Sequence, residues 1–405
     1  MVNRIEGLLQ SFIFDFDIRK LERAESILYS LLVKKECLLL ENKANKTVKQ
    51  LEILVNRYHD LRGLVYKRLL RTRMLAASLL EERIFQPPER LIVLLTHRCQ
   101  LRCRYCRVKK YTDSMDERVL RQSIDLLFTS NRRHIQLQFF GGEPLLRFDL
   151  IKKAVAYARS LKPAVKKTVS FLLTTNGICL TKETIDYFSK HNFCVECSID
   201  GEIQRQLKNR GHRNENNYYD IVTKNFSALF DSTLPHYSIS VFMPQDAGKL
   251  FESFKYLVKL GFKKLQANYA LGVFWPDNAV ATLFKETAKI ARYLRKHKEI
   301  KFLNFSDERK EPVVLNAELT VDCNGEIFRE TGICLEEDFK SMKKKFFVTD
   351  VKKAGNINLL SVSPLTNFYL LSRAYGAGGQ GMRKIILNNI NLGSQYSIFI
   401  KKLWI

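Results

Sequence analysis

The chain has 405 residues, of which 46% are hydrophobic and 27% are charged. These values are typical of a globular protein with a large core. No apolar run approaches the roughly 18–20 residues of a membrane span, which argues against an integral membrane protein. Acidic Glu6, Asp15 and Asp17 among the first hydrophobic residues argue against a signal peptide. Nine cysteines, an odd number at irregular spacing, argue against a disulfide framework and predict a reducing cytoplasm.

The charge is strongly basic, with 67 Lys and Arg against 42 Asp and Glu and a formal net charge of +25. Such an excess permits nucleic acid, an anionic membrane surface or an acidic peptide as partner, although a solvated basic surface is the plainer interpretation. The last 67 residues, from Phe339, hold one acid, Asp350, and eleven bases: Lys340, Lys343, Lys344, Lys345, Lys352, Lys353, Arg373, Arg383, Lys384, Lys401 and Lys402. We expect an anionic partner to dock at this basic tail.

Residues 1–86 are predicted to form a helical extension. Apolar residues from Leu51 to Leu70 recur at three-to-four spacing with Lys and Arg between them, which is typical of amphipathic helices. Pro87-Pro88 then ends the helix and marks a domain boundary. Packing on the same protein is the default for such helices, and pairing with another chain or gripping a substrate are the alternatives.

Residues 87–285 alternate short strands with helices, which predicts a parallel sheet with crossover helices. The expected helices are Asp116–Ser130, Leu150–Leu161, Lys182–His191 and Lys249–Leu260. One face of each strand after the first is partly polar: His134, Gln136 and Gln138; Ser170, Thr174 and Asn176; Glu196, Ser198 and Asp200; Ser238 and Ser240; Gln266 and Asn268. The alternate residues are mainly apolar, so we predict an α/β barrel whose helices cover the outside and whose lumen holds a polar ligand.

Residues 286–405 are predicted to form a small, basic α+β C-terminal region. A helix is expected over Asp277–His297, and a hairpin over residues 317–328 with its turn at Asn324-Gly325. The chain end, with Gly376, Gly378, Gly379 and Gly381 close together, is expected to be rich in loops.

Three cysteines, Cys99, Cys103 and Cys106, follow the apolar run Leu91–Leu95 at C-x3-C-x2-C spacing. A loop after a buried strand can wrap three thiols around one metal centre. Structural zinc usually takes four ligands as paired couplets, and no second couplet follows here. Three thiolates on an iron–sulfur cube leave one iron open to another ligand. Ordinary buried cysteines are the plain alternative.

This loop, with aromatic Tyr105 before the third cysteine, resembles the signature of the radical S-adenosylmethionine (radical SAM) superfamily. Three further motifs follow in the same order as in that superfamily: Gly141-Gly142-Glu143-Pro144, Thr175-Asn176-Gly177, and Ser198-Ile199-Asp200-Gly201 with Arg210 beyond it. Their order is similar to the branch that contains anaerobic sulfatase-maturing enzymes and other peptide maturases. The resemblance covers roughly residues 89–275.

The resemblance implies a partial (β/α)6 TIM-like barrel, one [4Fe–4S] cluster on Cys99, Cys103 and Cys106, and SAM as the second cofactor. It also implies SAM-binding roles for several residues. The implied set is Tyr105, Gly141, Gly142, Glu143, Pro144, Asn176, Ser198, Asp200 and Arg210. Glu143 is expected near the methionine ammonium and Arg210 near its carboxylate. A flavodoxin- or ferredoxin-like electron donor is implied as well.

Two departures from the branch stand out. Relatives commonly carry His-Asp after the Ser-x-Asp-Gly turn, where this chain has Gln206-Leu207, so their substrate reaction should not be transferred. Related maturases often bind extra clusters near the C-terminus, but Cys323 and Cys334 alone cannot complete a four-ligand cluster, so we predict none. We expect His97 to pack beside the cluster loop rather than to bind metal.

Three functions are compatible with these patterns. The first is a radical SAM enzyme that abstracts hydrogen from a peptide or protein side chain, with Glu196 or Asp200 as a candidate proton acceptor. The second is a radical SAM enzyme that modifies RNA, favoured by the net charge. The third is a non-catalytic scaffold that holds a cluster, against which the intact Gly141–Pro144 motif argues.

Overall fold

The computed structural model describes residues 88–106, 112–212, 218–306, 312–316, 318–329, 346–360, 371 and 380–404. The chain divides into two compact units, and everything described below, apart from most of α15, lies in the larger one, Pro87–Lys310, Glu318–Ser361 and Phe399–Ile405. The predicted N-terminal helices, Cys334 and the Lys340–Lys345 cluster lie outside the described residues. The division into three domains stays a prediction.

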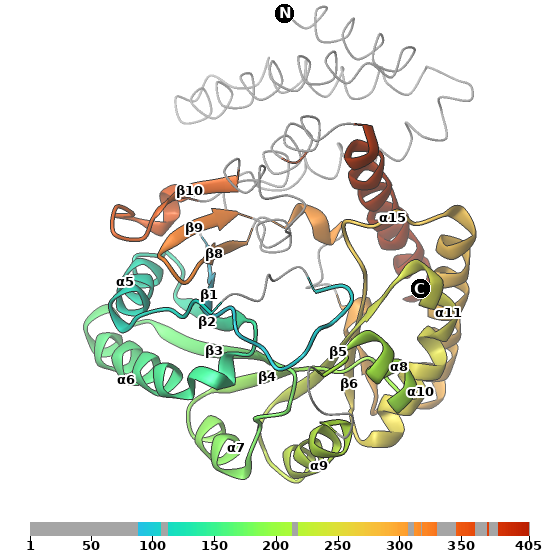
Figure 1. Ribbon diagram of the computed structural model, residues 1–405, viewed down its shortest axis with the longest axis horizontal. Helices are drawn as coiled ribbons and strands as arrows, with labels where there is room; N and C mark the ends of the chain where they lie inside the picture. The colour runs from blue at the N-terminus through green and yellow to red at the C-terminus, as the bar shows by residue number, and fades with distance from the viewer. Residues whose placement is uncertain are drawn as a thin grey trace, which may run out of the picture. The chain divides into compact units, whose positions relative to one another are not determined.

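A single curved sheet organises the larger unit, with ten strands among the described residues in the order β10-β9-β8-β1-β2-β3-β4-β5-β6-β7 (Figure 1). The strands are β1 (Arg90–Thr96), β2 (His134–Gly141), β3 (Thr168–Thr175), β4 (Phe193–Ser198), β5 (His236–Phe242), β6 (Lys264–Tyr269), β7 (Lys301–Phe302), β8 (Leu319–Val321), β9 (Glu326–Arg329) and β10 (Phe347–Asp350). Strands β1 to β7 pair in parallel. The predicted α/β fold with a partial parallel barrel is confirmed.

Helices connect successive parallel strands and cover the outer face of the sheet (Figure 1). They are α5 (Glu117–Phe128), α6 (Phe148–Val165), α7 (Lys182–Ser189), α8 (Ile203–Asn209), α9 (Tyr218–Phe230), α10 (Leu250–Leu260) and α11 (Asp277–Lys296). Asp116 and Thr181 cap α5 and α7 by accepting a hydrogen bond from a backbone N–H of the first turn. Among the described residues, no helix is long and apolar enough to cross a membrane.

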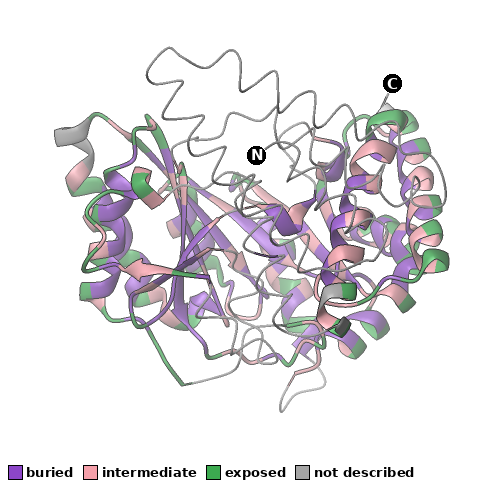
Figure 2. Ribbon diagram, turned by 90° about the horizontal axis from the view of Figure 1, so that it is seen from above, coloured by how far each residue is buried: buried purple, intermediate pink, exposed green. Residues whose placement is uncertain are grey.

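Aromatic side chains hold the helices against the outer face. Phe139, Phe171 and Phe193 stand side by side on β2, β3 and β4, with ring centroids 4.9–6.0 Å apart. Phe188 of α7 packs on Phe193 at 4.5 Å. Figure 2 shows the strands largely buried, while the helices are exposed on the side away from the sheet. This aromatic layer fixes which face of each strand points outward, and therefore which residues line the inner face.

The inner face is partly polar on β2, β3, β4 and β6, as predicted, but the inward-facing residues of β5 differ from the prediction. Glu196 of β4 is in register with Tyr237 of β5, so Tyr237 and its alternates lie on the inner face. Ser238 pairs with Cys197 and lies on the outer face with Ser240, where both are buried. The prediction that Ser238 and Ser240 face the lumen was therefore wrong by one residue. Ser238 and Ser240 alternate with apolar Ile239 and Val241, but alternation shows only which residues share a face and not which face points inward.

The C-terminal hairpin is confirmed and extends the same sheet. Strands β8 and β9 are antiparallel, the turn contains Gly325 at φ +92°, and β8 pairs in parallel with β1. The prediction of a loop-rich chain end was wrong from Gln380 onward, because Gln380–Trp404 forms helix α15. Its buried Ile386, Ile390, Tyr396 and Ile400 recur near helical spacing, a signal that the glycines obscured.

Candidate functional site

The three cysteines lie in the loop that leaves the C-terminal end of β1. Cys99 and Cys103 are half-buried and Cys106 is exposed. Burial raises the pKa of the Cys103 thiol to about 12, although Arg210 opposes this shift and the charges of Cys106 and Cys99 add to it. The three sulfurs therefore share one electrostatic environment, and a metal bound by Cys103 must displace a proton.

The segment after α8 holds this loop from one side through its backbone. Arg102 N donates to Gly211 O at 2.7 Å, and Arg104 N donates to Asn209 O at 2.8 Å. Leu101 forms an isolated antiparallel bridge with His212. The loop is thus paired like a short strand between its cysteines, which restricts where the thiols can point. The sequence carries no local signal for this pairing, because it depends on a segment more than 100 residues away.

The Gly141-Gly142 segment holds the loop from the other side. Gly142 N donates to Thr96 O at 2.7 Å, and Glu143 N donates to Arg98 O at 2.8 Å. A Cβ on Gly142 would stand 2.1 Å from Arg98 O, and one on Gly141, at φ +124°, would stand 2.4 Å from Thr96 O. Both glycines are therefore required where the two backbones meet.

The Glu143 carboxylate ties three motifs together. It is fully buried, and its Oε1 accepts hydrogen bonds from Thr175 Oγ1 at 2.8 Å and Leu145 N at 3.1 Å. Its Oε2 accepts a hydrogen bond from Asn176 N at 2.8 Å. The Asn176 amide in turn donates to Gln100 Oε1 at 3.3 Å and approaches Cys99 Sγ at 3.7 Å. The structure thus gives Glu143 a role in joining strand ends, while its predicted contact with the methionine ammonium stays a prediction.

A second buried carboxylate, Asp200, joins the cysteine loop to the segment after α8. Tyr105 OH donates to Asp200 Oδ2 at 2.5 Å, and Arg210 Nε forms an ion pair with Asp200 Oδ1 at 3.1 Å. The Arg210 guanidinium also lies 5.3 Å from the centre of the Tyr105 ring. Burial raises the pKa of Tyr105 well above its ordinary value, so the phenol is a stable donor. The structure brings Tyr105, Asp200 and Arg210 together, while their roles in binding SAM stay predictions.

Two residues of α8, neither of which the sequence predicted to bind a cofactor, position Asp200. Gln206 is buried and its Oε1 accepts a hydrogen bond from Asp200 N at 2.8 Å. Arg205 donates to the carbonyls of Asp200 and Val241, the latter at 2.7 Å, and lies over the Phe242 ring. The Gln206-Leu207 pair noted in the sequence as a departure from the maturase branch therefore includes a residue that supports Asp200.

Below the strand ends, a row of polar side chains crosses the inner face from β2 to β5. Gln138 Nε2 donates to Thr174 Oγ1 at 3.1 Å, and Thr174 Oγ1 donates to Glu196 Oε1 at 2.9 Å. Tyr237 OH donates to Glu196 Oε2 at 2.7 Å. Burial raises the pKa of Glu196, while the hydrogen bonds from Tyr237 and Thr174 oppose this shift. Ser198, one step higher on β4, is half-buried at the edge of the same face.

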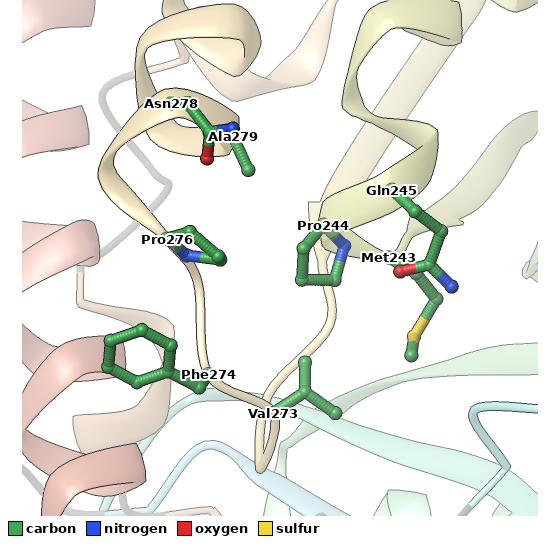
Figure 3. Close-up of a pocket in the computed structure, with 8 residues that line it drawn as sticks. All are labelled: Met243, Pro244, Gln245, Val273, Phe274, Pro276, Asn278 and Ala279. Atoms are coloured by element: carbon green, nitrogen blue, oxygen red, sulfur yellow. The ribbon is translucent and has the colours of Figure 1, made fainter.

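A pocket of about 440 Å³ opens at the C-terminal ends of β5 and β6, the same edge of the sheet (Figure 3). Its lining is mostly apolar and includes Met243 and Pro244 after β5, and Val273, Phe274 and Pro276 before α11. The carboxyl edge of a parallel barrel is where binding residues collect, and the cysteine loop, the glycine pair and this pocket all follow that rule.

Residues 93–260 match the model of the Radical SAM superfamily, so this part of the chain is similar to that superfamily. An uncharacterized protein of Methanocaldococcus jannaschii is 30% identical over 177 residues, 43% of this chain and 60% of that protein. The serine-type anaerobic sulfatase-maturating enzyme of Bacteroides thetaiotaomicron is 31% identical over 113 residues, 25% of this chain and 27% of that enzyme. The chain thus aligns with less than two thirds of each of these relatives.

The fold is also similar to that of a solved structure, native anSMEcpe with bound AdoMet and Cp18Cys peptide. The TM-score is 0.63 at 16% identity, covering 78% of this chain and 97% of that one. This likeness supports the barrel assignment. The superfamily implies SAM and an iron–sulfur cluster, and the donor set here fits both: three clustered thiols for iron, and backbone and side-chain polar groups at the strand ends around them.

We predict that Gly142→Ala separates the glycine segment from the cysteine loop, because its Cβ would meet the Arg98 carbonyl at 2.1 Å. The loss should be about 1–3 kcal/mol of unfolding free energy, as for other overpacked sites. Urea unfolding of the variant measures it. Gly355→Ala is the matched control, because no atom lies within 4 Å of its Cβ, and this variant should unfold like the wild type.

We predict that Glu196→Gln stabilises the protein more at pH 8 than at pH 5. Because burial raises the pKa of Glu196, this group's favourable contribution is present below its unfolded pKa and is lost as pH rises through the folded pKa. The variant has no carboxylate to ionise, so it does not lose this stability. Its melting temperature relative to that of the wild type should therefore rise with pH, by about 2–4 °C for each kcal/mol of unfolding free energy that the wild type loses. Thermal unfolding of both proteins across this range tests the sign. A difference that is flat with pH, like that of exposed Glu183→Gln, would contradict it.

Proposed function

We propose that the protein is a radical SAM enzyme that modifies a peptide or protein side chain in a reducing cytoplasm. The observation that carries this proposal is the double anchoring of the cysteine loop. One side is bound by the Gly142–Glu143 backbone and the other by Asn209 and Gly211, so three thiols are held at the carboxyl edge of a barrel whose inner face is polar. A cluster kept only for structure would need no such open, polar face beside it.

Each motif then has a function that its contacts support. Cys99, Cys103 and Cys106 would hold a [4Fe–4S] cluster with one iron left for the amino and carboxylate groups of SAM. A bound cluster and SAM would together supply reductive radical chemistry that removes a hydrogen atom from the substrate, with the electron coming from an external donor. The chain's own residues would position SAM and exclude water around it. Asn176 and Ser198 offer hydrogen bonds at the strand ends, and Arg210 offers a buried cation.

A peptide is the better-supported substrate class. One relative is a sulfatase-maturating enzyme, and the solved structure of similar fold contains a peptide beside AdoMet. The basic tail would attract an acidic segment of such a substrate, and an external flavodoxin- or ferredoxin-like protein would supply the electron. RNA is the second candidate because the net charge of +25 favours it. The reaction itself is left open, since Gln206-Leu207 replaces the residues common in the maturase branch.

We predict that the anaerobically reconstituted protein binds about four irons per chain and, once reduced, slowly cleaves SAM to 5′-deoxyadenosine and methionine. Changing Cys99, Cys103 and Cys106 together to Ala should abolish both, because no iron ligand of this loop remains. Iron analysis and chromatography of the nucleoside measure the two results. Cys194→Ser is the control, since Cys194 lies within β4 and should retain both. An iron content that survives the triple change would refute the assignment.

We predict that the protein binds acidic peptides encoded near its own gene more tightly than it binds total tRNA at about 150 mM salt. Lys343, Lys344 and Lys345→Glu should weaken peptide binding and leave uncoupled SAM cleavage unchanged, because the substitutions act only on docking. These lysines lie outside the described residues, so their choice rests on sequence. Reversal of exposed Lys182, Lys190 and Lys259 is the charge-matched control. Binding of tRNA without peptide binding would favour RNA modification instead.

A further inference from the structure

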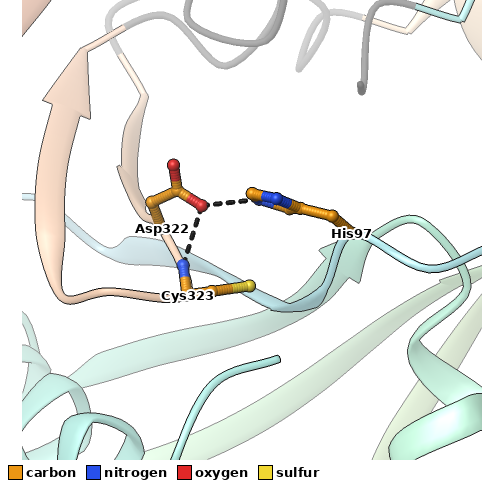
Figure 4. A group of neighbouring side chains, drawn as sticks. All are labelled: His97, Asp322 and Cys323. Carbon is orange, nitrogen blue, oxygen red and sulfur yellow. Dashed lines mark hydrogen bonds and ion pairs between the residues drawn. The ribbon is translucent and has the colours of Figure 1, made fainter. Parts of the chain in front are cut away.

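A group of metal-ligand side chains lies beside the cysteine loop but outside the three-cysteine motif (Figure 4). His97 follows the end of β1, and Asp322 and Cys323 begin the turn between β8 and β9. One ligand atom from each lies within 4.8 Å of the other two, and all three residues are buried. The sequence separates His97 from the other two by more than 220 residues, so only the parallel pairing of β8 with β1 brings them together.

The closest contact in this group is between His97 Nε2 and Asp322 Oδ1, at 2.7 Å. On the opposite side of the ring, His97 Nδ1 lies 3.7 Å from the Asp113 carboxylate. A histidine that binds metal through one ring nitrogen almost always directs the other nitrogen toward a carboxylate or carbonyl, which orients the ring. The Asp113 carboxylate lies on that side of the ring, beyond hydrogen-bond distance in this structure, and the Asp113 backbone accepts a hydrogen bond from His97 N at 3.0 Å.

The carboxylate and the thiol are oriented in the same way. Asp322 Oδ1 accepts a hydrogen bond from Cys323 N at 2.7 Å, which fixes the carboxylate rotamer. The Cys323 thiol approaches Leu94 O at 3.1 Å. The backbone therefore orients the Asp322 carboxylate, and metal binding would replace the hydrogen bond that the Cys323 thiol donates to Leu94 O. Figure 4 shows the three side chains converging from the two backbone segments.

We propose that His97, Asp322 and Cys323 form a binding site for a single Zn²⁺ ion. An imidazole nitrogen, a carboxylate oxygen and a thiolate sulfur are the three ligand types that zinc accepts together, and three protein ligands leave a fourth tetrahedral position for water or another group. Binding would replace the thiol proton of Cys323, which is released to solvent, and would neutralise the two negative ligands. The site is separate from the proposed cluster and does not depend on the proposed function.

The position of this site gives it a structural consequence. His97 lies two residues before Cys99, and Asp322 and Cys323 lie in the hairpin turn. A metal bridging them would bind the start of the cysteine loop to the added hairpin. The alternative is a metal-free cluster in which Cys323 packs as an apolar residue with Ile92, Leu94 and half-buried Phe140, and His97 is hydrogen-bonded to Asp322. Metal content distinguishes the two.

The test is zinc analysis of the purified full chain, with zinc-edge X-ray absorption, which detects zinc independently of iron. The proposal predicts about one zinc per chain after removal of loosely bound metal. It also predicts one sulfur neighbour at about 2.3 Å among nitrogen and oxygen neighbours at about 2.0–2.2 Å. Cys323→Ser should remove the sulfur neighbour and lower zinc content at least tenfold, and Asp322→Asn should also lower zinc content.

Cys194→Ser is the matched control, because it removes a thiol from β4 of the same sheet, away from β1 and β8, and should keep zinc at the wild-type level. Iron content and circular dichroism of each variant show whether the fold and the cluster loop persist. Wild-type protein with less than about 0.1 zinc per chain at micromolar zinc would overturn the proposal. Zinc that lacks a sulfur neighbour, or that is retained fully by Cys323→Ser, would indicate an adventitious ion only and would overturn it equally.

Discussion

The buried carboxylate of Glu143 is the interaction on which the arrangement of the site depends. It is fully removed from solvent and accepts hydrogen bonds from Leu145 N, Thr175 Oγ1 and Asn176 N. A buried carboxylate without such donors would cost several kcal/mol, so the ends of β2 and β3 must stay where they can supply them. The backbone N–H of Glu143 also donates a hydrogen bond to Arg98 O. The position of Glu143 therefore also restricts the position of the cysteine loop.

This constraint explains why the glycine pair precedes an acid. Gly141 and Gly142 allow the backbone to reach Thr96 and Arg98, and only then does Glu143 point into the strand ends. Asp200, just after the end of β4, also fixes the loop by binding residues of other segments, here Tyr105 and Arg210. Two buried acids, each hydrogen-bonded to donors from at least one other segment, therefore fix opposite sides of one loop. The cysteine loop links the two acids. Tyr105, which donates to Asp200, belongs to this loop, and Asn176, which donates to Glu143, contacts residues of it.

The sequence was sufficient for the features that depend on local pattern. Alternating strands and helices predicted the parallel barrel, Asn324-Gly325 predicted the hairpin, and the motif order placed all nine proposed cofactor-binding residues at one edge. What it could not supply depends on register and on distant pairing. The phase of β5 was wrong because the alternation of Ser238 and Ser240 with Ile239 and Val241 does not tell which face points inward. The glycine-rich approach to α15 hid a helix whose apolar spacing begins only after Gly381.

The pairing of β8 with β1 is the element with the widest consequences that no local pattern could reveal. It converts a hairpin expected in a separate C-terminal region into an extension of the barrel sheet, with Thr320 opposite Ile92. Cys323, which was not expected to bind a second cluster, therefore lies beside His97, which was expected only to pack. The argument against a second cluster counted cysteines alone. Once imidazole and carboxylate are counted as ligands, three donors suffice for a different metal, and the same fold that anchors the cysteine loop also assembles them.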